Sequence, residues 1–157
     1  MREIKFRGKH KNPYGDKWVY GYYAIEHGEH VIIMPHSTNY ETALKENRPI
    51  STTSVKHTID YNTLGQYTGL KDKNKSKIYE GDILRYEGGG IYRVVFDEMM
   101  IMCPQDNIEE PSPGYYGILI GDKTKELCPL GVTQRLAKVI GNIHDNPELL
   151  GSEDKYD

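Results

Sequence analysis

Aromatic and basic side chains in the middle of the chain have the types and spacing that could bind single-stranded nucleic acid. Tyr79 and Tyr92 lie in adjacent predicted strands, with Arg85 and Arg93 close by in sequence. Small β-barrels bind single strands by stacking bases on aromatic rings, with basic groups around them. A lysine-rich turn precedes these strands. The candidate nucleic-acid-binding residues are Lys73, Lys75, Tyr79, Arg85, Tyr92 and Arg93.

A plainer interpretation of the same residues is structural. Strand tyrosines pack in cores, and turn lysines protect a sheet edge from pairing with another chain. The chain has 20 basic and 23 acidic residues and a net charge of −3 at pH 7. A general duplex binder needs an electropositive footprint, which these totals do not provide. The structural interpretation is favoured, and nucleic-acid binding is the alternative.

The histidines do not form a recognisable metal site. His27, His30 and His36 lie within ten residues, and two of them flank a predicted turn. A zinc site needs three or four ligands, and the spacing of these histidines matches no established signature. We therefore expect exposed hairpin histidines, no metal and no other cofactor.

No catalytic constellation is visible either. The carboxylate pairs, such as Asp97–Glu98, fall in predicted turns where water screens them. Gly88–Gly90 lacks the Lys-Ser/Thr of a phosphate-binding loop, and neither Cys103 nor Cys128 has a motif partner. We expect a protein that is not an enzyme, with an enzyme of unknown class as the third alternative.

The elements that position these residues are predicted to be short strands. The firmest prediction is a β-hairpin over residues 65–85, whose polar turn KDKNKSK is followed by a bend at Gly81. Other alternating segments precede and follow it, and residues 105–114, QDNIEEPSPG, are expected to form a loop. The pattern predicts a mainly β protein, a small barrel or two-lobed β-barrel of short antiparallel strands.

The chain is expected to divide into two β lobes. Residues 1–58 form the first, with a polar loop or insertion at 36–57, and residues 59–150 form the second, while 151–157 are a disordered tail. Near the end, Asn146 as N-cap and Pro147 at the first helical position predict a short helical turn. Leu149 and Leu150 would then cover an open end of the sheet. Whether residues 1–58 form a separate barrel stays open.

Three segments together resemble the YopX family of phage and prophage proteins. They are MREIKFR, GQYTGLKDKNKSKIYEGDIL and VIGNIHDNPELL, and their order and spacing match over residues 1–150. Ser76 and His144 depart from residues common in the family. The resemblance implies a mostly β protein that is encoded by a phage or prophage and acts inside the bacterial host. It implies no catalytic or ligand-binding residue.

The function expected from the sequence is therefore binding. The hydrophobic fraction of 37% includes 13 tyrosines, so the core is modest, and Tyr is favoured at subunit interfaces. We expect a non-enzymatic interaction protein that forms a homo-oligomer and contacts a phage or host protein. MREIKFRGK lacks the apolar core of a signal peptide and no stretch is long enough to span a bilayer, so a cytoplasmic location is expected.

Overall fold

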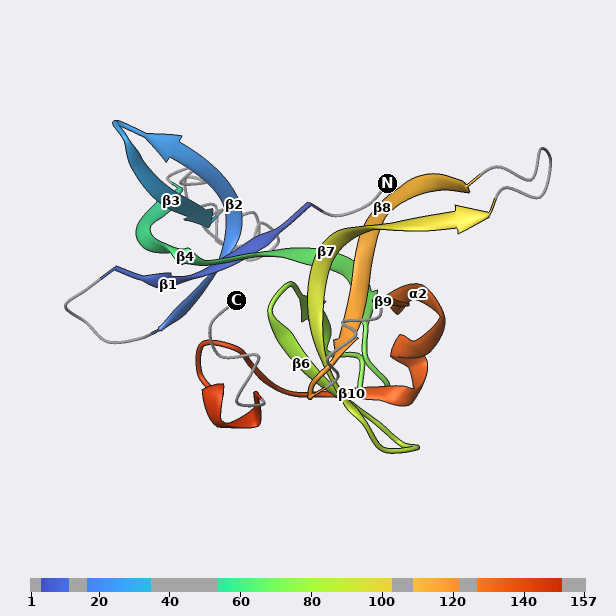
Figure 1. The fold of residues 1–157 in the computed structure, drawn as a ribbon. Helices are drawn as coiled ribbons and strands as arrows, with labels where there is room; N and C mark the ends of the chain where they lie inside the picture. Colours follow the sequence, from blue (N-terminus) through green and yellow to red (C-terminus); the bar gives the residue numbers. More distant parts are fainter. Residues whose placement is uncertain (1–3, 12–16, 35–53, 103–108, 122–126, 151–157) are drawn as a thin grey trace, which may run out of the picture. The chain divides into compact units, whose positions relative to one another are not determined.

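A computed structural model describes residues 4–11, 17–34, 54–102, 109–121 and 127–150. It is mainly β, with antiparallel strand pairs throughout and a few short helical turns (Figure 1). The mainly β prediction is confirmed. The chain divides into two compact units, residues 1–66 and 67–157. The predicted division after residue 58 stays a prediction.

In the first unit, four strands pair in a closed order. They are β1 (Phe6–His10), β2 (Trp18–Glu26), β3 (Glu29–Met34) and β4 (Val55–Lys71). Each pairs with the next, and β4 also pairs back with β1, so the sheet is ring-like. The predicted β2–β3 hairpin is present, and its turn places His27 and Gly28 at positive φ, as a type I′ turn requires.

The interior of this ring holds the core of the first unit. Alternate residues of the strands face inward, and Ile32 and Ile59 are almost fully buried there, with Val19 beside them. Gly8 leaves the space that Ile59 fills, because a Cβ at residue 8 would lie 2.6 Å from the Ile59 side chain.

The second unit contains a five-stranded sheet and several short helical turns. Its elements are β5 (Lys77–Tyr79), β6 (Asp82–Tyr86), β7 (Ile91–Met102), β8 (Glu109–Leu119), β9 (Leu127–Pro129), α2 (Leu130–Thr133), η1 (Gln134–Leu136), β10 (Ala137–Asn142) and η2 (Pro147–Leu149). The strand order in the sheet is β10-β6-β7-β8-β9, and β5 pairs instead with the end of β4. The core of the unit consists of Ile78, Leu84, Val94, Leu130 and Ala137.

The hairpin predicted over residues 65–85 is present in its first part. β4 turns into β5, and Gly81, at φ 78°, makes the predicted bend. After this bend, however, β6 leaves the hairpin and pairs with β7 and β10. The bend therefore moves the chain from one sheet to the other.

The loop prediction for residues 105–114 is wrong over its second half. Residues 109–114 belong to β8, although Pro111 and Pro113 lie among them. Proline is tolerated on an edge strand, where no neighbour needs its missing amide. The other half, like residues 36–53 of the predicted insertion and the predicted tail, lies outside the described residues. Residues 55–57 belong to β4.

The predicted C-terminal turn is present as η2. Asn146 occupies the N-cap position and Pro147 begins the turn, but the Asn146 side chain makes no capping hydrogen bond. Its Oδ1 instead accepts from the Asn142 amide at 3.3 Å. Leu149 and Leu150 are half-buried. The short helices α2 and η1 were not predicted.

Candidate functional site

Tyr79, a predicted stacking residue, belongs to the core of the second unit. Only 5% of it is exposed, and its ring lies 5.5 Å from that of Tyr67. Its amide donates to Asp82 Oδ2 at 2.7 Å. A ring with this burial packs the core and offers no face to a base.

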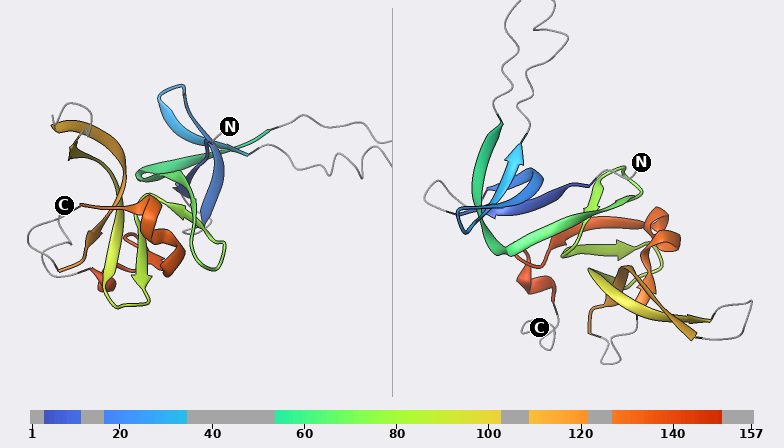
Figure 2. Two further views of the ribbon diagram at one scale, coloured as in Figure 1. Left: turned by 90° about the vertical axis from the view of Figure 1, so that its right-hand side faces the viewer. Right: turned by 90° about the horizontal axis from the view of Figure 1, so that it is seen from above.

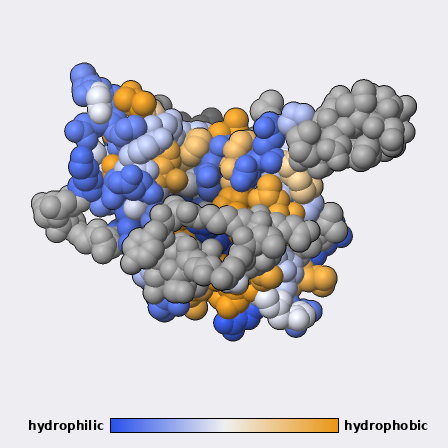
Figure 3. All heavy atoms as spheres, in the orientation of Figure 1, coloured by the Kyte–Doolittle hydropathy of each residue, from blue (hydrophilic) through white to orange (hydrophobic). Residues whose placement is uncertain are grey.

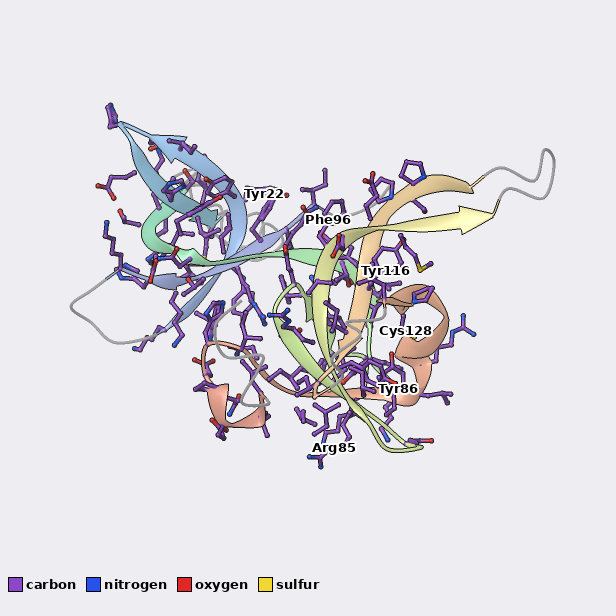
Figure 4. The ribbon with its side chains drawn as sticks, viewed as in Figure 1. Tyr22, Arg85, Tyr86, Phe96, Tyr116 and Cys128 are labelled. Atoms are coloured by element: carbon purple, nitrogen blue, oxygen red, sulfur yellow. The ribbon has the colours of Figure 1, made fainter. Side chains whose placement is uncertain are left out.

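The other predicted aromatic and the two arginines lie on opposite faces of the sheet. Register pairs Leu84 with Tyr92 and Ile83 with Arg93. Directly paired residues share a face and neighbours along a strand alternate, so Tyr92 lies on the face of core residue Leu84. Arg85 and Arg93 lie on the other face. Figure 4 shows Arg85 and Tyr86 on opposite sides of β6.

The two turn lysines belong to the β4–β5 turn and not to the strands that carry the arginines, although the Lys73 amide donates to the Ala137 carbonyl of β10 at 3.0 Å. Lys73 forms an exposed ion pair with Glu87, Nζ to Oε1 2.8 Å, and this bond lowers the pKa of Glu87. Lys75 is exposed and has φ 67°. The six candidates thus do not form one surface, and nucleic-acid binding by them stays a prediction.

The arginines have a basic neighbour that the sequence alone did not indicate. Lys138 of β10 lies directly opposite Arg85, and Arg93 lies diagonally from Arg85 across β6 and β7. We call Lys138, Arg85 and Arg93 the basic row. No ion pair joins any of them to another described residue. Strand register was the missing signal, since Lys138 is 53 residues from Arg85 in sequence.

A second feature is the ribbon formed by β7 and β8. The pairing of β7 with β6 covers residues 91–93 and ends at Arg93. The pairing of β8 with β9 begins at Tyr116. Residues 95–102 and 109–115 therefore pair only with each other among the described strands. We call these residues the arm. Within the second unit, the arm runs past the ends of β6 and β9 (Figures 1 and 2).

The two edges of the arm differ in chemistry. The β8 edge carries Pro111 and Pro113, which lack amide donors, a common protection against strand addition. The β7 edge has no proline and changes from Asp97 and Glu98 to the apolar run Met99–Met102. The β7 edge is thus the one that can accept another strand.

Exposed aromatic surface lies at the base of the arm. Phe96 is 55% exposed, and its ring packs edge-to-face on Tyr115, directly opposite on β8, with ring centres 5.1 Å apart. Figure 3 shows that hydrophobic residues reach the surface between hydrophilic ones on the face it draws. Half-exposed aromatics of this kind are typical of interfaces.

Two of the histidines considered for a metal lie in the first unit. His30 Nδ1 forms a hydrogen bond with the Tyr23 hydroxyl, and the His30 ring stacks on Tyr61. His27 is exposed in the turn. His36 lies outside the described residues. Among the described residues, no helix is long and apolar enough to cross a membrane.

Comparison with known proteins gives a family but no activity. No curated protein matches the chain. A solved structure, that of protein EF1440 from Enterococcus faecalis, is similar at 20% identity and a TM-score of 0.48, and the alignment covers 96% of this chain and 100% of that one. The family model described as YopX protein matches residues 5–151. This match spans nearly the whole chain and confirms the resemblance noted in the three segments, and the chain therefore belongs to the YopX family.

Proposed function

We propose that the protein is a non-enzymatic binding protein that associates with a second copy of itself through the β7 edge of the arm. The observation that carries the proposal is the unequal protection of the arm, in which proline blocks the β8 edge whereas residues 95–102 on the β7 edge include no proline. A two-stranded ribbon alone is marginally stable in water. Strand addition at β7 would supply a further strand and cover the arm.

The sequence of β7 suits antiparallel pairing with its own copy. Directly opposed residues of antiparallel strands share a face and neighbours along a strand alternate, so a two-fold axis must place one residue opposite itself. An axis at Met99 would place this methionine opposite Met99 of the copy. Asp97 and Glu98 would then face Ile101 and Met100 of the copy. No like charges meet directly in this register, and self-complementary contacts are what a two-fold interface requires.

Charge substitutions at the centre of this register test the proposal. Met100→Glu would bring two pairs of carboxylates face to face, each formed with Glu98 of the other copy. Met100→Lys would bring opposite charges together at the same two places. Within the arm, residue 100 directly faces Pro111, which carries no charge. Like charges at two directly opposed pairs should weaken dimerisation about tenfold.

Sedimentation velocity across micromolar concentrations gives the readout. We expect the wild type and Met100→Lys to dimerise and Met100→Glu to dimerise about tenfold more weakly, with all three showing the same circular dichroism spectrum. A wild type that stays monomeric throughout, or equal dimerisation of the two variants, would contradict the proposed interface.

The genetic origin and the cellular location of the protein are also proposals. Membership of the YopX family supports an origin in a phage or prophage and action in the bacterial cytoplasm, with a phage or host protein as a further partner. Fractionation of an infected or induced host, with antibody detection of the protein, tests this setting. Recovery in the culture medium would contradict it.

The basic row supports a second candidate function, binding of single-stranded nucleic acid. Arg85 and Lys138 face each other directly, an arrangement that is unfavourable for like charges unless an anion lies between them. A phosphate backbone along the row would supply that anion. Three phosphate contacts predict a slope of about −2 for log affinity against log salt concentration.

A salt-dependent mobility shift with an oligonucleotide tests this candidate. Arg85→Ala and Arg93→Ala should each weaken binding and flatten the salt slope, whereas Lys75→Ala, which removes the same charge from the exposed turn, should have little effect. Absence of binding to any oligonucleotide at low salt would exclude this function.

A further inference from the structure

Two histidines that are far apart in sequence lie close together in the first unit. His10 ends β1 and pairs with Ile59 of β4, and His57 lies two residues before Ile59 on the same strand. The two histidines are therefore diagonal neighbours on one face of the β1–β4 pair. Backbone hydrogen bonds hold this end of β1, since the Lys11 amide donates to the Thr58 carbonyl at 2.8 Å.

The two imidazole rings each carry a buried nitrogen without a hydrogen-bond partner among the described residues. These atoms are Nδ1 of His10 and Nε2 of His57. The ring centres lie 5.2 Å apart and the planes meet at 73°. Buried polar atoms without partners are uncommon in proteins and call for an explanation. Here, two of them occur on adjacent rings.

We propose that His10 and His57 together bind a divalent transition-metal ion. Imidazole nitrogen binds zinc at about 2.0–2.1 Å, which places the ring centre about 3.2 Å from the metal. Two such rings at a tetrahedral angle have centres about 5.2 Å apart. The observed separation matches this value. One bound ion would give both nitrogens a partner, and it would account for the two unpaired buried atoms at once.

The surroundings suit a weak, half-buried site for a borderline-soft metal. Burial, together with the neighbouring His10, lowers the pKa of His57, which favours the neutral ring that binds metals. No group of three metal-binding side chains exists among the described residues, so water would complete the coordination. Two nitrogen ligands favour Cu²⁺ over Ni²⁺ and Zn²⁺, and disfavour Mg²⁺.

The single tryptophan provides a direct readout. Trp18 lies opposite Lys9, the residue before His10, and bound Cu²⁺ quenches tryptophan fluorescence at such short range. In protein without a polyhistidine tag, we expect Cu²⁺ to quench Trp18 with saturation near one equivalent. His10→Gln and His57→Gln should each raise the Cu²⁺ concentration that gives half-maximal quenching at least tenfold. His27→Gln, which alters an exposed turn histidine, and Mg²⁺ serve as controls.

A second measurement does not depend on variants that must fold. Zn²⁺ added to the wild type should shift the imidazole NMR signals of His10 and His57 and leave that of His27 in place, and it should raise the thermal unfolding temperature. Quenching that does not saturate, or that survives in both glutamine variants, would overturn the proposal. Unchanged His10 and His57 signals at excess Zn²⁺ would also overturn it, because the rings would then be in simple aromatic contact.

Discussion

At the scale of single residues, one buried carboxylate organises the lysine-rich turn. Asp72 is 5% exposed. Its Oδ1 accepts from the amides of Asn74 and Ser76, both at 2.8 Å, and its Oδ2 accepts from the Val139 amide at 3.0 Å. One side chain thus closes the β4–β5 turn and ties it to β10. The turn is fixed by this carboxylate, and positive φ falls on Lys75, not on Ser76.

Replacing Asp72 by asparagine should destabilise the protein substantially. An amide keeps one oxygen acceptor, but its NH₂ group would face an amide donor in place of the second oxygen. Loss of one charge-assisted bond and burial of an unsatisfied donor predict a cost of about 2–3 kcal/mol in the free energy of unfolding. Urea denaturation followed by circular dichroism measures this cost.

Asp97→Asn is the matched control for this prediction. The Asp97 carboxylate is exposed and accepts from the Glu98 amide at 2.8 Å, a contact within one exposed strand. We expect its replacement to change stability by less than about 0.5 kcal/mol. Equal losses for the two variants would show that Asp72 does not hold the turn against β10.

At the scale of elements, the end of β10 depends on a glycine. A Cβ at Gly141 would overlap the Asn146 side chain, whose Oδ1 lies against the backbone there. The register of β10 on β6 also shifts between Val139 and Gly141, as in a β-bulge. The Asn142 side chain completes the turn by accepting from the His144 amide at 3.0 Å. β10 and η2 are thus packed together through backbone proximity.

Gly141→Ala should therefore loosen the β10–η2 junction. The added methyl group forces the Asn146 side chain away from the Asn142 amide, and overpacking of this kind costs about 1–3 kcal/mol. Gly88→Ala is the control, because a Cβ there meets nothing within 4 Å. Thermal unfolding should show a lower midpoint for the first variant. A midpoint equal to that of Gly88→Ala would mean that the Asn146 contact is dispensable.

Elements governed by local chemistry could be predicted from the sequence. The β2–β3 turn at Gly28, the bend at Gly81 and the turn at Pro147 each follow from residues a few positions apart. The assignment of β6 to a different sheet from β5 could not be predicted, because it depends on pairing with β10, more than 50 residues away. The prolines of β8 caused the wrong loop prediction for residues 109–114, since proline indicates a loop unless the strand is known to lie at a sheet edge.

The candidate sites show the same division between local and non-local information. Arg85 and Arg93 could be picked from the sequence, but their separation from Tyr92 follows from the β6–β7 register. His10 and His57 were not considered together, because 47 residues separate them and no motif links them. Alternation within a strand is readable from one sequence, whereas the partner strand is not.

At the scale of the whole molecule, each unit has its own core. Ile32 and Leu84 are fully buried in the first and second cores, respectively. β4 is the strand that contributes to both units, and the division falls within it, between Gln66 and Tyr67. Residues 59–66 therefore belong to the first unit by structure and to the second lobe by the prediction from sequence.

Core truncations in each unit, read by amide hydrogen exchange, distinguish these two boundaries. Ile32→Ala should cost about 2–5 kcal/mol in the first core and speed exchange in β2 and β3, while Leu84→Ala should do the same for β6 and β7. If the division lies after Gln66, the amides of residues 59–66 will follow Ile32→Ala, because the side chain of Ile59 packs in that core. If they follow Leu84→Ala, the boundary predicted at residue 58 is right. Faster exchange everywhere in both variants would show that the two units unfold as one, since a strand shared by two cores can also couple them.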